Sequence, residues 1–442
     1  STDRYEFSPP SRRVGVAPAA RGDAGLDDAC LGVAYSIGER LEREALWAGG
    51  RCTWLGAMQD ANRRCVGAAA GDLYGGSSGV ALFLAELYAA TGDQRFAATA
   101  VGALRHAFAT AERIAVRLRL GLHAGWTGVA LAAAHVAALT ARHEVCEPAQ
   151  TLLAGAPRTS EAGELDLMMG SAGAIVALVS LSERWADEAL LAWARQLGDE
   201  IVASAVAFEQ GCSWVTINKA REYHLTGLSH GTAGMAHALL VLFRATGESR
   251  YRATAERAFA YERYWFDERE GNWPDLREAA QGKRRGRHAL AYSSYWCHGA
   301  PGIALSRLLA CELLPDPRHQ REAAVALATT AATVRRDCAA RAGNFSLCHG
   351  LAGNADVLLT GSRAAGVDFE LGGQLAREVA ATGISRHTDG LASDWPCGTG
   401  HGQSPSLMLG LAGIGLFYLR VCRPNVLSPL SLGLASSGRR AG

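Results

Sequence analysis

Short apolar segments with helical spacing recur along the chain, separated by turn residues. Residues 80–90 (Val-Ala-Leu-Phe-Leu-Ala-Glu-Leu-Tyr-Ala-Ala) are apolar at nearly every position, which predicts a buried helix. The turn residues 91–93 end it, and apolar positions from about Phe96 to Leu118 predict a second helix. Residues 27–49 also predict a helix with one apolar face. Patterns that alternate apolar and polar positions are scarce, so the sequence favours an all-α protein.

A pair of glycines three residues apart precedes each buried helix. The pairs are Gly76/Gly79, Gly125/Gly128, Gly170/Gly173, Gly231/Gly234, Gly299/Gly302, Gly350/Gly353 and Gly410/Gly413. They repeat a scheme of loop, inner helix, turn and outer helix at intervals of roughly 45 to 70 residues, which is typical of an architecture built from one supersecondary unit.

The glycines indicate how the repeats are joined. We expect the first glycine of each pair to allow unusual backbone dihedrals and the second to allow close packing of neighbouring backbones. A closed ring of such units is an (α/α) toroid, or barrel, of seven helical hairpins with the Gly-rich loops at one mouth. We expect an irregular N-terminal segment at 1–25, a single barrel domain at 26–426 and a flexible tail at 427–442.

Composition and charge limit the classes of partner and the cellular location that we expect. Apolar residues make up 49% of the chain and the formal net charge is +1, so a large core can form and nothing favours nucleic acid or an acidic membrane as partner. No apolar run is long enough to span a bilayer, and the polar start is not a signal peptide. We therefore expect a cytoplasmic protein without an integral membrane segment. Eleven cysteines at irregular spacing argue against a disulfide framework.

Two cysteines occupy the same point of adjacent repeats. They lie in Trp296-Cys297-His298-Gly299 and in Leu347-Cys348-His349-Gly350, each directly before a Gly-x-x-Gly pair. Thiolate and imidazole are good ligands for Zn2+. The pattern indicates a metal site where the repeats converge, although cysteine can also serve as a small buried apolar residue.

The same motifs resemble those of the lanthionine synthetase C-like cyclase family. The matching segments are Gly227-Leu-Ser-His230-Gly-Thr-Ala-Gly234, Tyr295-Trp-Cys297-His-Gly-Ala-Pro-Gly302 and Leu347-Cys348-His349-Gly-Leu-Ala-Gly353-Asn354. Trp54-Leu55-Gly56, Leu73-Tyr74-Gly-Gly-Ser-Ser-Gly79 and Pro405-Ser-Leu-Met-Leu-Gly410 are most similar to the cyclase half of class II lanthipeptide synthetases. The resemblance implies a Zn2+ ion bound at one mouth of the barrel by Cys297, Cys348 and His349.

The resemblance also implies a reaction. Zinc-dependent cyclases of this family add peptide cysteine thiolates to dehydroalanine or dehydrobutyrine, which forms (methyl)lanthionine thioether rings. The resemblance gives proton transfer to His230, with Asp166 to orient it, whereas a structural histidine and a helix N-cap are the alternatives. His298 is assigned to substrate contact or to packing. Stand-alone family members carry an Arg at the position of Ser293 and a Tyr at the position of His298, and these residues assist the enolate. We expect His298, Tyr295 or an Arg of 283–287 to assist the enolate in this chain instead.

Partners follow from that chemistry. The resemblance implies a dehydrated precursor peptide as substrate and a dehydratase, fused upstream or separate. The basic stretch 283–287 could grip an acidic leader peptide or be a solvated loop, and the irregular segments 155–165, 267–287 and 386–406 are candidate lids. In the last of these, His401 is expected to be a solvated loop residue and Cys397 a buried thiol rather than a metal ligand.

Two other functions remain open at this point. One is a zinc protein that adds glutathione to dehydroamino acids, and the other is a non-catalytic peptide-binding scaffold. The paired carboxylates of helical-toroid glycosidases do not accompany the repeats.

Overall fold

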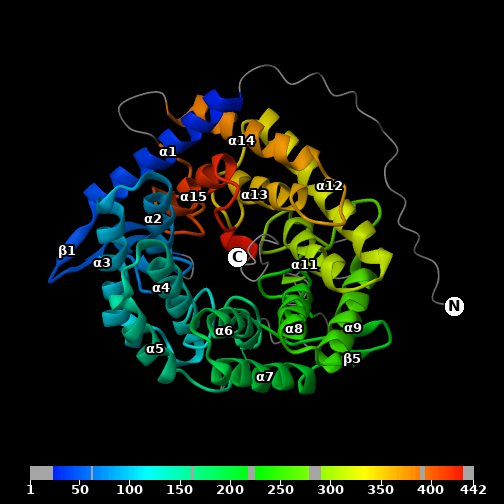
Figure 1. Cartoon of the computed structure of the whole chain (residues 1–442). Coiled ribbons are helices and arrows are strands. Elements are labelled where there is room, and N and C mark those ends of the chain that lie inside the picture. The colour runs from blue at the N-terminus through cyan, green and yellow to red at the C-terminus, as the bar shows by residue number, and fades with distance from the viewer. Residues whose placement is uncertain are drawn as a thin grey trace.

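Two concentric rings of helices form the body of the molecule (Figure 1). The computed structural model describes residues 23–60, 63–160, 164–217, 224–277, 290–388 and 394–431. Seven inner helices lie in this part of the chain, each starting directly after the first glycine of a pair: α2 (Ser77–Thr91), α4 (Trp126–Thr140), α6 (Ser171–Trp185), α8 (Thr232–Thr246), α11 (Ala300–Leu313), α13 (Leu351–Ser362) and α15 (Leu411–Cys422). The predicted all-α barrel of seven hairpins is therefore confirmed.

Six of the inner helices are followed in the chain by the outer helix that covers them. These are α3 (Gln94–Thr110), α5 (Cys146–Ala154), α7 (Glu188–Ala203), α9 (Ser249–Trp265), α12 (Pro317–Ala339) and α14 (Leu371–His387). The seventh, α15, packs instead against α1 (Asp23–Glu44), the first helix of the chain. An ion pair of 2.6 Å between Asp27 of α1 and Arg377 of α14 lies at the same joint. The ring thus closes by pairing the two ends of the chain.

Two predicted helices are shorter than expected, and one boundary moves. The helix predicted over 27–49 ends at Glu44, and β1 (Leu46–Ala48) pairs with β2 (Arg51–Thr53) around Gly49 and Gly50. Both glycines have positive φ angles of 57° and 74°, which suits the tight turn of a hairpin. The helix predicted from Phe96 ends at Thr110, whose hydroxyl bonds back to a carbonyl one turn earlier. Because α1 starts at Asp23, the segment predicted as irregular over 1–25 ends in helix.

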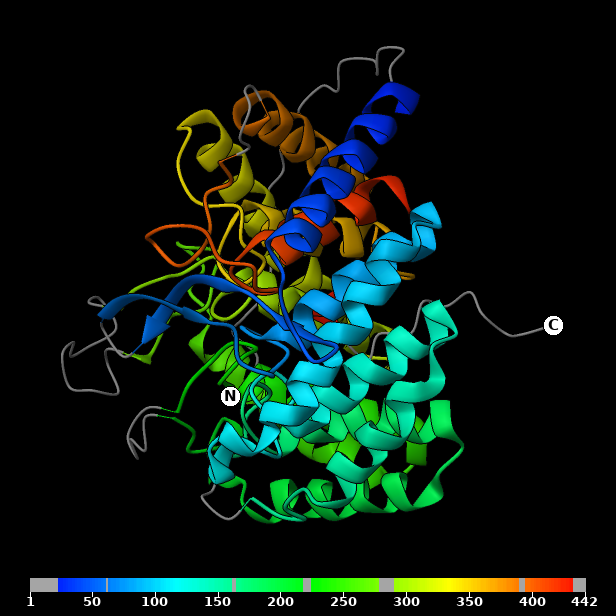
Figure 2. The same cartoon turned by 90° about the vertical axis from the view of Figure 1, so that its left-hand side faces the viewer.

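The strands of the described residues form three short antiparallel hairpins. Beside β1 and β2, β3 (Leu55–Asp60) pairs with β4 (Arg63–Ala68), and β5 (Val206–Phe208) pairs with β6 (Gly211–Ser213). The β3–β4 hairpin projects from the body of the barrel (Figure 2). Ala57 of β3 donates a backbone hydrogen bond of 2.8 Å to Gln403, which ties the hairpin to the seventh loop.

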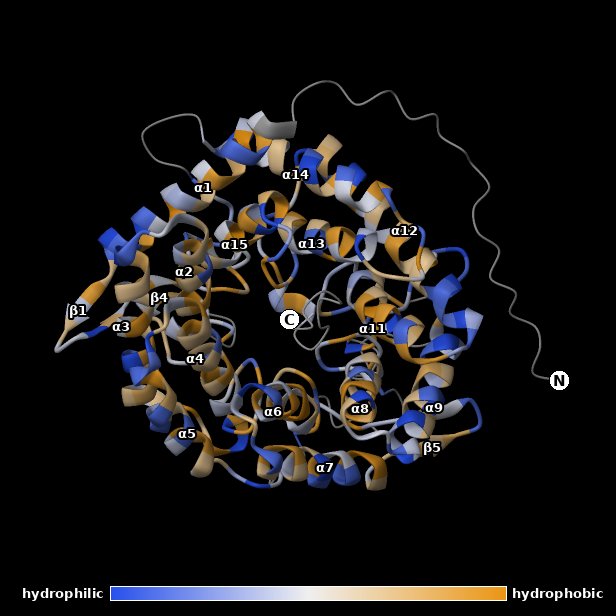
Figure 3. Cartoon of the chain, in the orientation of Figure 1, coloured by the Kyte–Doolittle hydropathy of each residue, from blue (hydrophilic) through white to orange (hydrophobic). Residues whose placement is uncertain are grey.

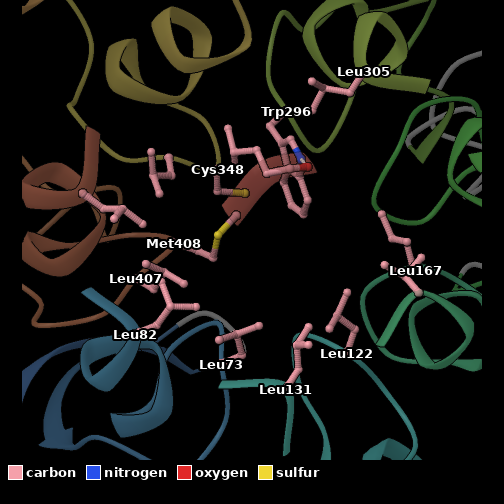
Figure 4. Packing of buried hydrophobic residues seen from close by; sticks show 14 of the residues in the cluster. Leu73, Leu82, Leu122, Leu131, Leu167, Trp296, Leu305, Cys348, Leu407 and Met408 are labelled. Atoms are coloured by element: carbon pink, nitrogen blue, oxygen red, sulfur yellow. Dashed lines mark hydrogen bonds between the residues drawn. The ribbon is translucent and has the colours of Figure 1, made fainter. Parts of the chain in front are cut away.

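The core lies within and between the two rings. Inner helices are apolar around most of their circumference, while the outer helices carry polar residues on their outward side (Figure 3). This distribution follows from covering the inner helices on both sides. Figure 4 shows large side chains that converge on the lumen. One comes from each loop, six residues before the second glycine, and all are buried: Leu73, Leu122, Leu167, Leu228, Trp296, Leu347 and Leu407.

The glycine pairs act through close approach more than through unusual dihedrals. Six of the seven first glycines have negative φ and extended backbone, such as Gly76 at −105°, and only Gly299 has a positive φ, at 93°. Our expectation for the first glycine was therefore wrong at six loops. A Cβ on Gly76 would lie 2.5 Å from backbone atoms of Asp72, and a Cβ on Gly79 would lie 2.7 Å from the Cβ of Leu407. Side chains are excluded because the loops and repeats touch there.

The end of the described chain enters the ring. Residues 427–431, predicted to belong to a flexible tail, include the short helix η5 (Pro429–Ser431), which is buried and lies in the centre of the view of Figure 1. The indole nitrogen of Trp296 donates a hydrogen bond of 3.2 Å to the Leu430 carbonyl. The described part of the predicted tail therefore fills space in the lumen. The Ser/Gly/Arg-rich composition of the tail does not predict this burial.

Candidate active site

Seven equivalent positions line one mouth of the barrel. Each directly follows one of the lumen residues named above, and together they are Tyr74, His123, Met168, Ser229, Cys297, Cys348 and Met408. Backbone hydrogen bonds between these positions link the loops into a ring: 74 to 123 (2.9 Å), 123 to 168 (3.0 Å), 168 to 229 (3.2 Å), 229 to 297 (3.3 Å), 348 to 408 (3.0 Å) and 408 to 74 (3.1 Å). Equivalent residues of adjacent repeats are therefore neighbours.

The link between positions 297 and 348 is made differently. Within the described residues no backbone hydrogen bond joins these two positions, and the loop of Cys297 bends back on itself through a bond from Tyr295 to His298 (3.0 Å). In place of a backbone bond, the side chains of Cys297 and Cys348 lie close enough for each to shift the pKa of the other. The two cysteines, 51 positions apart in the sequence, thus meet because they occupy the same place in adjacent repeats.

The surroundings make the two thiols unequal. The neighbouring Cys348 thiol lowers the pKa of Cys297, against the effect of burial, and the positive charge of Arg277 lowers it further. The neighbouring Cys297 sulfur and burial raise the pKa of Cys348 well above its usual value. Burial raises the pKa of Tyr74 well above its usual value and the nearby Cys348 adds to this effect, so the phenol stays protonated. Cys297 is the sulfur that is set up to carry negative charge.

His349 is fixed in one tautomer beside the thiols. Its Nε2 lies 2.9 Å from the Gly398 carbonyl oxygen, which can only accept, so Nε2 carries the hydrogen and Nδ1 keeps a lone pair. Such a bond to the second nitrogen is how proteins orient metal-binding histidines. Over the described ranges, no three histidine, cysteine or acidic side chains converge closely enough to hold a metal ion as they stand. The sulfurs of Cys297 and Cys348 and the imidazole nitrogen of His349 are nevertheless the kinds of donor that zinc takes.

Asp166 and His230 form a pair at the same mouth. Oδ2 of Asp166 accepts a hydrogen bond of 2.8 Å from Nδ1 of His230, while Oδ1 accepts from the backbone N–H groups of Met168 (2.9 Å) and Met169 (2.7 Å). Asp166 is fully buried and His230 is partly exposed. Asp166 does not cap a helix, because the N-cap of α6 is Gly170. Among the described residues the Nε2 of His230 has no hydrogen-bond partner, so it can face solvent or substrate.

Glu262 holds the loop of His230 from behind. This fully buried side chain of α9 accepts hydrogen bonds from the backbone N–H groups of Gly227 (3.2 Å) and Ala233 (2.9 Å), at the two ends of that loop. Burial raises the pKa of Glu262 to about 7, partly offset by Arg307.

The remaining candidates differ in their distance from the pair. His298 is buried with its ring centroid 6.1 Å from that of His230, and burial lowers its pKa to about 3, which keeps it neutral. His401 bonds to the Thr399 and Cys65 carbonyls (2.9 and 3.3 Å), and the Cys397 sulfur accepts from the Ser404 N–H at 3.5 Å. His298 alone among these three contacts the Asp166–His230 pair.

The structure adds residues that the sequence motifs did not single out. Arg277 forms a two-point ion pair with Asp275 (2.9 and 2.6 Å), and Ser293 donates to the same carboxylate at 3.3 Å. The guanidinium therefore comes from another segment near the position where stand-alone relatives are expected to carry their Arg. Tyr74 occupies the position equivalent to the cysteines, so superposing the repeats on their second glycines would have found it. Arg277 has no such signal.

Several predicted features fall beyond the described residues. The basic stretch 283–287, proposed to grip a leader peptide or supply a catalytic cation, lies there, as do parts of the candidate lids 155–165, 267–287 and 386–406. Across the ranges that are described, no helix has the length and apolar character needed to cross a membrane.

Known proteins resemble the chain in sequence and in fold. The model of the lanthionine synthetase C-like protein family matches residues 68–431. A lacticin 481/lactococcin biosynthesis protein of Lactococcus lactis subsp. lactis is 26% identical over 196 residues, which cover 43% of this chain and 20% of that protein. The match thus spans about a fifth of the relative's length. The solved structure of nisin cyclase shares the fold with a TM-score of 0.60 and 15% identity, over 92% of this chain and 98% of that one.

Proposed function

Because the chain belongs to the lanthionine synthetase C-like family, we propose that it is a lanthipeptide cyclase that forms thioether rings in a dehydrated peptide. The observation that carries this proposal is the meeting of two reactive groups at one mouth. The Cys297–Cys348 thiol pair with His349 lies on one side, and the Asp166–His230 pair lies on the other, with His298 next to His230.

Cys297, Cys348 and His349 would hold the metal, as the donor set favours. Zn2+ bound there would lower the pKa of a substrate cysteine and supply its thiolate near neutral pH. The protein's own groups prepare the place: Cys348 and Arg277 favour negative charge on Cys297, and the Gly398 carbonyl presents the Nδ1 lone pair of His349.

The ring-forming step is an addition without loss of atoms. The cysteine sulfur bonds to the β-carbon of dehydroalanine or dehydrobutyrine, the carbon–carbon π bond breaks, and an enolate develops on the α-carbon side. His230 then delivers a proton to the α-carbon from Nε2, while the Asp166 carboxylate holds Nδ1 and stabilises the charged imidazole. The proton given up by the thiol balances the proton gained by the α-carbon. The neutral, buried His298 lines the space next to His230.

This chemistry defines the partners. The substrate must reach the protein already dehydrated, so a dehydratase, fused upstream or separate, has to act before it. The test is to incubate the purified, zinc-loaded protein with a dehydrated peptide that contains one cysteine, and then to alkylate free thiols. Loss of alkylation without a change in peptide mass supports the proposal, whereas full alkylation at every enzyme concentration contradicts it. Addition of glutathione to the peptide, seen as added mass, would instead favour the detoxifying alternative.

A further inference from the structure

A second feature of the mouth is a large cavity beside His230 that the proposed chemistry does not use. It has a volume of about 740 Å³, and its wall includes both His230 and Tyr74. Most of the wall comes from the first three repeats, which contribute the end of β4 with the segment after it, the end of α3 with the turns that follow it, and the loop of Asp166; Ile217 and His230 come from the fourth. The cavity therefore opens from the reacting groups toward one side of the barrel.

Its wall is mainly apolar although it faces the mouth. Six small or apolar side chains account for much of it: Ala68, Ala70, Ile114, Ala115, Leu118 and Met169. Most of them are exposed or half-buried, which is unusual for apolar groups clustered around one hollow. The one carboxylate in the wall, Asp72, already accepts a bond of 2.7 Å from the Gly75 N–H, and burial raises its pKa. The wall thus favours an apolar occupant.

The position of His230 determines which part of a substrate can reach this cavity. If His230 protonates the α-carbon of the dehydro residue, that carbon must lie within hydrogen-bond reach of the ring, about 3 Å. The α-carbon of the next residue is then only about 3.8 Å further along the chain. The side chains that flank the dehydro residue are therefore the groups that meet the cavity. At 740 Å³ it falls within the roughly 300–1,000 Å³ of pockets that hold small ligands, so it has room for such side chains.

Resting on the proposed function, we propose that this cavity is a specificity subsite that receives apolar side chains next to the dehydro residue of the peptide. A leucine-sized neighbour would bury its surface against Leu118, Ile114 and Met169. A carboxylate in the same place would lose its water, and the cation in the wall, Arg113, is exposed, so solvent screens the attraction that it offers. The protein would therefore select its ring sites by the residue beside the dehydro group, in addition to the dehydro group itself.

Two synthetic peptides test this subsite by binding. Each carries alanine in place of dehydroalanine, so that it cannot react, followed by a test residue, two glycines and a cysteine; the test residue is leucine in one and aspartate in the other. Fluorescence anisotropy of labelled peptides should give a Kd for the leucine peptide roughly ten- to hundred-fold lower, the range expected for burying one such side chain. Ala115→Lys should reverse this preference by offering the carboxylate a second cation beside Arg113.

A matched variant separates the subsite from a general effect of charge. Val116, the next residue, is 53% exposed and does not line the cavity, so Val116→Lys adds the same charge outside it and should leave the leucine preference unchanged. The proposal is overturned if wild type binds both peptides with Kd values within threefold, if it binds neither, or if the two lysine variants show the same preference.

The reactive forms of the peptides keep the two proposals apart. With dehydroalanine restored, cyclisation of both peptides at equal kcat/KM would leave the proposed function standing and remove the subsite. Selective binding of the leucine peptide without any cyclisation would remove the proposed function and leave the subsite standing.

Discussion

Replacing Asp166 by asparagine changes the chemistry of the mouth with little change in shape. In the native protein Oδ1 accepts two backbone N–H groups and Oδ2 accepts from His230. Asparagine has one oxygen, and the two backbone donors will hold it on the Oδ1 side. Its amide nitrogen then faces Nδ1 of His230, which must become an acceptor, so the ring hydrogen moves to Nε2. Asp166→Asn therefore removes a charge and selects the wrong tautomer.

The size of the effect follows from the geometry. With 2.8 Å between the oxygen and the nitrogen, the charge centres of carboxylate and imidazolium lie about 4 Å apart, and at an effective dielectric constant of about 20 they attract by about 4 kcal/mol. Because every 1.4 kcal/mol is a factor of about ten, losing this attraction as His230 becomes charged should reduce kcat/KM about a thousandfold. The two backbone bonds remain, so we expect Tm to fall by less than about 3 °C.

Initial rates of thiol disappearance, measured by alkylation of a dehydrated peptide, provide the assay. Asp187→Asn is the control, because Asp187 caps the outer helix α7 through a bond to the Ala189 N–H; this variant should cyclise the peptide at the wild-type rate. An Asp166→Asn enzyme that works within about threefold of wild type would refute the reasoning and leave Asp166 as a residue that only shapes its loop.

Three further predictions concern the metal, the proton donor and pH. Elemental analysis should find about one zinc per chain in the wild type and none in Cys348→Ala. Removing the metal with a chelator should lower Tm, because no backbone hydrogen bond joins positions 297 and 348 within the described residues. A metal-free protein with full activity would contradict this prediction. His230→Ala should keep its zinc yet cyclise roughly 10²- to 10⁴-fold more slowly, and an unchanged rate would show that His230 is structural. Burial raises the pKa of Glu262 from 4.5 to about 7, so the native state holds a proton there that the unfolded chain loses first. Its contribution is present below about pH 4.5 and is lost as pH rises to about 7, by about 3 kcal/mol; Glu262→Gln should flatten that decline in urea unfolding, and an unchanged slope would assign it to other groups.

Local patterns predicted the repeat and the central pairing of the site. The glycine pairs mark the first residue of every inner helix, and the register of Cys297 and Cys348 within their repeats is what brings them together. Strands of three residues, such as β1 and β5, are too short to show an alternating pattern, although Gly49-Gly50 is a recognisable turn signal.

Other features depend on contacts that no local pattern encodes. Arg277 acts on Cys297 because Asp275 and Ser293 position its guanidinium, yet Arg277 lies 20 positions before Cys297 and 71 before Cys348, without a shared motif. The pairing of α1 with α15 and the burial of Leu430 against Trp296 likewise depend on closure of the whole ring. The metal ligands and proton-transfer residues remain predictions until they are tested.

Closure through α1 has a consequence for the order in which the protein can fold. Each of the first six hairpins can form from neighbouring segments as they emerge, but α15 has no cover until α1 returns from the other end of the chain. Asp27 and Arg377, which meet at this joint, are 350 residues apart, and such distant contacts form slowly because a long loop must close first. Until then the apolar side of α15 and the edge between Gly79 and Leu407 stay open to solvent. We therefore expect the last kinetic phase of refolding to be the joining of the two ends, and the open ring to be the species most exposed to aggregation.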